Sequence, residues 1–137
     1  MKKHIKKSEL YTTIIFGLLA SLLVDTYASF RFEAWGFFEK GKAEFSVLLI
    51  LLGIYPAAAA MIVNWYPYKS RWWLKLAYIL GWTICSTGYE WLTLKTGILW
   101  HVHWNLFYSL LLYPAIYYML IVHVRIYRWL QKYEKAV

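Results

Sequence analysis

The sequence predicts an all-α integral membrane protein, a single domain in which four transmembrane helices form a compact bundle. Of its 137 residues, 61% are hydrophobic and only 16% are charged, whereas soluble domains carry about 25% charged residues. Four apolar runs, at about residues 10–27, 45–65, 72–94 and 105–127, each have the roughly 20 residues that a helix needs to cross the bilayer. Lys and Arg gather between these runs, as in membrane anchors, so we expect no nucleic-acid partner.

The first run follows a basic head at residues 1–7. Ser8 suits the N-cap position of a helix, and Glu9 suits its first turn. A basic head before an apolar run also describes a signal peptide. Asp25, just before the cleavage-like residues 26–28, favours an uncleaved anchor instead. The loop at residues 26–44 alternates aromatic and charged side chains, which suits the headgroup region of a bilayer.

The second and fourth runs share the sequence Tyr-Pro-Ala, at residues 55–57 and 113–115, with a methionine at the same later offset. The first and third runs each carry an acid near the outer end, Asp25 and Glu90. A tandem arrangement of two plus two helices, with both halves in the same orientation, explains these similarities. The alternative is two independent helices, each kinked at its proline.

The distribution of cations predicts that both termini are cytoplasmic. Eleven of the fifteen Lys and Arg residues lie in the head, the second loop region and the tail, and four lie in the first and third loops. Cytoplasmic segments of plasma-membrane proteins carry such an excess. We expect anionic lipid headgroups to be contacted by the cations near these segments, namely Lys69, Arg71, Lys75, Arg125 and Arg128.

Five polar residues gather on the predicted outer side: Asp25, Glu90, His101, His103 and Asn105. A charge within a spanning segment costs about 2.5–3.5 kcal/mol at the centre and less toward the interface. Glu90 lies seven residues before Gly97, where a helix end is expected, so it is about 10 Å inside that end. The Glu90 carboxyl either snorkels outward, pairs with Lys95 or Arg31, or serves as a proton carrier, cation ligand or partner-recognition group.

His101 and His103 share a face only if the third loop is extended, because residues two apart on a helix point to nearly opposite sides. Imidazole and carboxylate groups are good zinc ligands, so these histidines and Glu90 could form a metal site. The alternatives are a pH-sensitive pair and an interfacial aromatic belt with Trp100 and Trp104. No cofactor is predicted.

Several short motifs are spread over most of the chain. They are Asp-Thr-Tyr at 25–27, Gly-Ile-Tyr-Pro at 53–56, Tyr-Glu-Trp-Leu at 89–92 with Lys95 and Gly97, and Trp104 with Tyr-Ser at 108–109 and Tyr-Pro at 113–114. On these motifs the chain resembles a family of small, uncharacterised four-helix membrane proteins of spore-forming Gram-positive bacteria. The resemblance implies the four-helix topology and singles out Glu90. It implies no activity or substrate, and the histidine pair is not part of the family pattern.

The expected function is that of a non-enzymatic plasma-membrane protein, a partner-binding or accessory subunit or a small sensor. Four short-looped helices suggest little room for a substrate cavity, and we expect a membrane-protein partner or a homo-oligomer. The alternative is an oligomeric proton- or cation-coupled transporter that uses Glu90 and Asp25. A further alternative is a membrane metal-dependent hydrolase built from these acids with His101 and His103.

Overall fold

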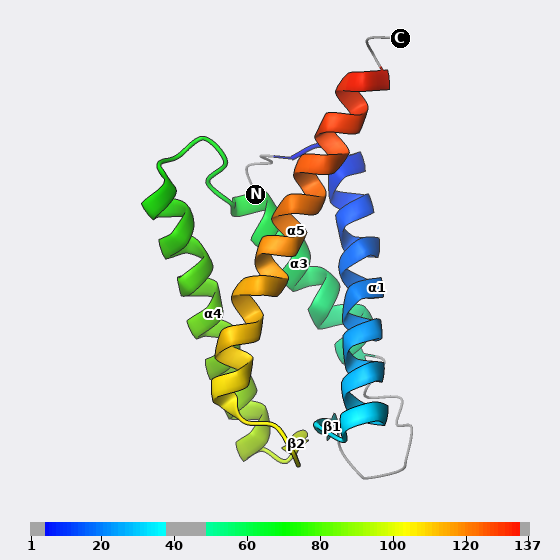
Figure 1. Ribbon diagram of the computed structural model, residues 1–137, viewed down its shortest axis with the longest axis vertical. Helices are drawn as coiled ribbons and strands as arrows, with labels where there is room; N and C mark the ends of the chain where they lie inside the picture. The colour runs from blue at the N-terminus through cyan, green and yellow to red at the C-terminus, as the bar shows by residue number, and fades with distance from the viewer. Residues whose placement is uncertain (1–4, 38–48, 135–137) are drawn as a thin grey trace.

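The computed structural model describes residues 5–37 and 49–134, and this part of the chain is mainly helical (Figure 1). A π-helical turn leads into one of the helices, and two three-residue strands pair with each other. The expected all-helical class is therefore confirmed. In chain order the elements are α1 (Lys7–Phe32), β1 (Trp35–Phe37), η1 (Ile50–Ile54), α3 (Tyr55–Trp65), α4 (Trp72–Lys95), β2 (Leu99–His101) and α5 (Leu106–Glu134).

Two segments of the described helices are long and apolar enough to cross a membrane, Lys7–Ala28 in α1 and Leu106–Glu134 in α5. The start of α1 and the end of α5 lie at one end of the bundle, and the two strands lie at the other (Figure 1). α1 packs on α3, and α4 packs on α5, which also contacts α1 and α3. The helices therefore form two pairs that meet along α5.

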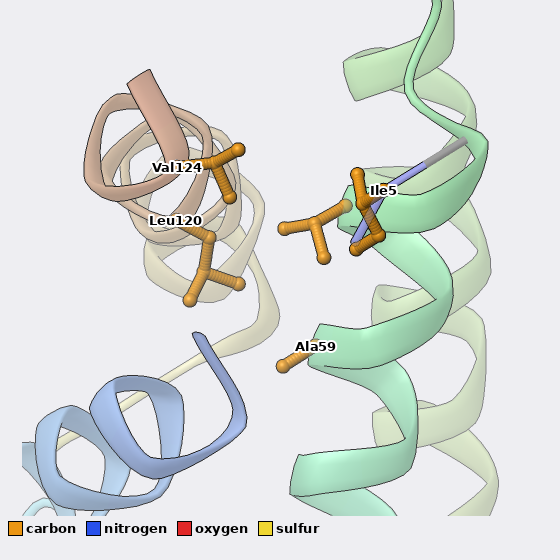
Figure 2. Packing of buried hydrophobic residues seen from close by; sticks show 5 residues of the cluster. Ile5, Ala59, Leu120 and Val124 are labelled. Atoms are coloured by element: carbon orange, nitrogen blue, oxygen red, sulfur yellow. The ribbon is translucent and has the colours of Figure 1, made fainter. Parts of the chain in front are cut away.

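The apolar core lies where α1, α3 and α5 meet. Ala59 and Val63 of α3 pack there against Leu120 and Val124 of α5, with Ile5 covering the end of the cluster (Figure 2). All five side chains are buried. Many large apolar side chains of α1, α4 and α5 instead point outward and are exposed, among them Leu19, Leu23, Trp72, Ile84 and Leu111.

The proline of the second run lies where a π-helical turn passes into a regular helix, within one continuous helical stretch from Leu49 to Trp65. Pro56 occupies the first turn of α3, directly after η1. Proline has no N–H to donate, and its ring clashes with a regular preceding turn. A π-helical turn is wider, and here the Tyr55 N–H reaches the Ile50 carbonyl. Pro114, in contrast, lies inside α5.

The helix ends differ from the expected ones at three places. α1 begins at Lys7, so Lys6 and not Ser8 holds the N-cap position. α1 continues to Phe32 instead of ending near residue 27, because residues 28–32 contain no glycine or proline to stop it. It ends at Glu33, which adopts a left-handed conformation with φ of 46°. α5 continues to Glu134 through the basic tail. Residues 45–48 of the second run, and Lys40 and Lys42 of the first loop, lie outside the described residues.

Candidate functional site

Glu90 is the centre of a hydrogen-bonded cluster between α4 and α5. Its side chain is buried, with 6% of the residue surface exposed. The Ser109 hydroxyl donates to Oε1 over 2.6 Å, and the Tyr113 hydroxyl donates to Oε2 over 2.7 Å. His101 Nε2 lies 3.0 Å from Oε1. Trp104 Nε1 in turn donates to the Ser109 hydroxyl over 2.8 Å. Both carboxylate oxygens of Glu90 therefore have partners.

Asp25 is the centre of a smaller cluster between α1, β1 and α3. The side chains of Trp35 and Tyr55 hydrogen-bond to its carboxylate. The Oδ2 atom is buried and has no hydrogen-bond partner among the described residues. A buried carboxylate oxygen without a donor is costly, because it has lost its water and gained nothing in return. Asp25 is thus less completely satisfied than Glu90.

The two clusters hold equivalent places in the two halves of the chain. In each half a long helix carries the acid, a three-residue strand follows, and the next helix among the described residues supplies a tyrosine that is followed by proline. Tyr55 binds Asp25 in the first half, and Tyr113 binds Glu90 in the second. The strand residues Trp35 and His101 provide further contacts, and these two residues are register partners between β1 and β2.

The pairing of β1 with β2 closes the bundle end near both acids. The strands are antiparallel, with Gly36 opposite Trp100. A Cβ atom on Gly36 would overlap the Trp100 ring, so only glycine permits this approach. His101 and His103 were expected to share a face only if the third loop is extended. Part of this loop, Leu99–His101, is extended and forms β2.

A cavity of about 240 Å³ lies inside the bundle, between the two halves. Both acids line it, together with aliphatic side chains of α1, α3 and α5 and aromatic side chains that include Trp35, Tyr55 and Tyr113. It is slightly smaller than the roughly 300–1,000 Å³ of drug-sized ligand sites. The bundle therefore has room for a small ligand, and the expectation of little room for a substrate stays a prediction.

No family model, curated protein or solved structure matches this chain.

The remaining residues of the predicted outer cluster do not reach the acids. His103 is exposed, and the Asn105 side chain accepts the Tyr108 N–H over 3.1 Å, which caps the start of α5. Among the described residues no group of three His, Cys, Asp or Glu side chains could hold a metal ion. The metal site of His101, His103 and Glu90, and the hydrolase alternative that depends on it, therefore stay predictions.

Several residues of the site were not singled out from the sequence. Ser109, Tyr113 and Tyr117 follow one another at intervals of four, which places them on one face of α5. Ser86 and Glu90 have the same interval on α4, and the Tyr117 hydroxyl donates to Ser86. The sequence signal for this contact was a row of polar side chains, spaced four residues apart, on each of the two apolar helices. Lys95, a considered partner of Glu90, lies 5.9 Å from the centroid of the Trp91 ring instead.

Arg128, one of the expected lipid anchors, pairs with Glu9. Its Nε and Nη2 atoms donate to the two carboxylate oxygens of Glu9 over 3.1 and 2.9 Å, and its guanidinium lies 4.4 Å from the centroid of the Tyr68 ring. Burial raises the pKa of Tyr68 to about 12, so this phenol stays neutral and donates to the Val63 carbonyl over 3.1 Å. The other expected anchors Lys69, Arg71 and Arg125 are exposed, and Lys75 is partly exposed.

Proposed function

We propose that this chain is a plasma-membrane protein with four spans, cytoplasmic termini and a tandem arrangement of its two halves. Two span-length apolar helices support this, as do the exposed apolar side chains on their outer faces. α4 has 24 residues, about 36 Å of helix, which is enough to cross a bilayer. The matched acid–tyrosine pairs support the tandem arrangement, because repeats in the same orientation place their sites at the repeat interface.

Labelling with a membrane-impermeant maleimide tests this topology. In a Cys85→Ser background, a cysteine at His103 is expected to react when the reagent is added outside intact cells, because His103 lies at the strand end of the bundle. A cysteine at Ser70, in the loop between α3 and α4, is expected to react only after the membrane is opened. The reverse pattern would overturn the orientation.

The function supported best is non-enzymatic binding of a small molecule in the cavity, in the manner of a sensor or accessory subunit. The observation that carries this is the cavity between the two halves, lined by both acids. A ligand there would touch all four α-helices, so its binding would change how the α1–α3 pair packs on the α4–α5 pair. Such a change is what a sensor passes to a membrane-protein partner or to a second copy.

Native mass spectrometry of protein taken from its own membranes tests this binding. We expect the wild-type chain to carry one small molecule of defined mass, and the Ala58→Phe variant, whose ring would fill part of the cavity, to carry none. Ala77→Phe is the matched control, because Ala77 is exposed on α4. Equal occupancy in wild type and Ala58→Phe would overturn the assignment of the ligand to this cavity.

A further inference from the structure

The geometry points to a ligand class: we propose that the cavity binds a small organic ammonium compound whose positive charge pairs with Asp25. The inference rests on the proposed function, since it names the ligand of the same cavity. Three independent features of the described residues carry it. These are the unequal partners of the two acids, the charge balance of the lining, and the aromatic and apolar character of the walls.

The two acids occupy equivalent places, yet their hydrogen bonding differs. Glu90 accepts from Ser109 and Tyr113 and has His101 at 3.0 Å, so both of its oxygens are occupied. Asp25 has hydrogen bonds with side chains of β1 and α3, and its buried Oδ2 has no partner in residues 5–37 and 49–134. Oδ2 is closed off from the cavity, so a donor that enters the cavity would complete Asp25 after the carboxylate turns toward it, whereas Glu90 already has partners on both oxygens. A cationic donor suits Asp25 best, because hydrogen bonds between charged groups are the strongest.

The charge balance of the lining selects a cation. Two carboxyl side chains line the cavity, whereas no Lys or Arg is among the described residues that line it. The His101 imidazole also lines it, but it lies beside Glu90, at 3.0 Å. A carboxylate or phosphate ligand would therefore face the Asp25 carboxylate without a compensating cation. In a medium of low dielectric constant, like charges a few ångströms apart repel strongly. The cavity thus rejects anions and favours a single positive charge.

The walls select an organic cation over a metal ion. Most of the lining is apolar, with side chains such as Ile54, Ile62 and Leu112. Hard metal cations need about six oxygen ligands, and no group of three His, Cys, Asp or Glu side chains that could hold a metal exists in the described part of the chain. Trp35 and Trp104 stand edge to face with centroids 4.9 Å apart. Aromatic faces of this kind attract ammonium groups.

Three probes of similar size separate these possibilities: n-butylammonium, n-butanol and n-butyrate. Each is titrated calorimetrically into the full-length protein in micelles at pH 7, with protein-free micelles as the reference. We expect n-butylammonium to bind at least about tenfold tighter than n-butanol, because it adds a charge-assisted hydrogen bond. We expect n-butyrate to bind weakest of the three.

The variant that tests the assignment is Asp25→Asn, which keeps the shape and removes the charge. It is expected to weaken n-butylammonium binding about 10- to 100-fold and to leave n-butanol binding nearly unchanged. Glu33→Gln is the matched control, since it removes a carboxylate near the same end of the bundle but from an exposed position. The affinity of the Glu33→Gln variant for n-butylammonium should equal that of the wild type.

Three outcomes would overturn the inference. Equal binding of all three probes would show that the cavity binds apolar molecules without regard to charge. The proposed ligand-binding function would then stand, but the assignment of a cationic ligand would fall. Displacement of n-butylammonium by sodium chloride, but not by an equal concentration of choline chloride, would indicate an inorganic cation site. If Asp25→Asn still prefers n-butylammonium over n-butanol by the wild-type factor, the group that pairs with the ammonium is not Asp25. The comparison of probes on wild-type protein does not depend on whether that variant folds.

Discussion

Replacing Arg128 by methionine is expected to lower the free energy of unfolding by about 3 kcal/mol. Glu9 is 4% exposed, and Arg128 donates to both of its carboxylate oxygens. Without the guanidinium, Glu9 keeps a backbone donor, the Lys6 N–H at 3.2 Å. Breaking a fully buried pair costs about 3–5 kcal/mol. The lower value applies here because 32% of the Arg128 side chain is exposed.

The loss can be measured by SDS titration in mixed micelles, followed by circular dichroism. Lys132→Met is the matched control, because Lys132 is an exposed cation on the same helix, and we expect a change within about 0.5 kcal/mol. The double variant Glu9→Gln with Arg128→Met should recover part of the stability, because the uncompensated buried charge is gone. Equal losses for Arg128→Met and Lys132→Met would show that the pair contributes nothing.

The same pair shows which part of the fold the sequence cannot predict. Glu9 and Arg128 are 119 residues apart, and nothing in either local pattern indicates the other. Arg128 lies in a basic tail, where local reasoning favours lipid headgroups. The packing of the start of α1 beside the end of α5 brings the two charges together, and this depends on the arrangement of all the helices.

The helices themselves could be predicted because their signal is local. Apolar runs of about 20 residues specify helices regardless of what packs on them. Their ends were less clear, since aromatic and charged residues at 28–32 suit both an interfacial loop and a helix. The cost of burying a carboxyl singled out Glu90 correctly as a buried acid. Its partners Ser109 and Tyr113 lie on a different helix, and only their spacing of four pointed to them.

Replacing Glu90 by leucine is expected to lower the free energy of unfolding by about 3–5 kcal/mol, because several buried donors lose their acceptor at about 1–3 kcal/mol each. Ser109 and Tyr113 would keep their hydroxyl groups but would have no carboxylate to donate to. Glu90→Gln should cost less, about 1–3 kcal/mol, since its carbonyl oxygen still accepts one donor while its NH₂ group faces another. SDS titration measures both variants.

Asp25→Asn is the informative comparison, because it makes the same isosteric change in the other half of the bundle. The buried Oδ2 of Asp25 meets no donor in the described residues, so an amide NH₂ can take its place without opposing another N–H or O–H group. We therefore expect Asp25→Asn to be more stable than Glu90→Gln. Equal losses at the two acids would mean that Asp25 is as fully bonded as Glu90. A larger loss of unfolding free energy in Glu90→Gln would mean that Glu90 stabilises the packing of α4 on α5. Asp25 would then be the acid that is available to a ligand.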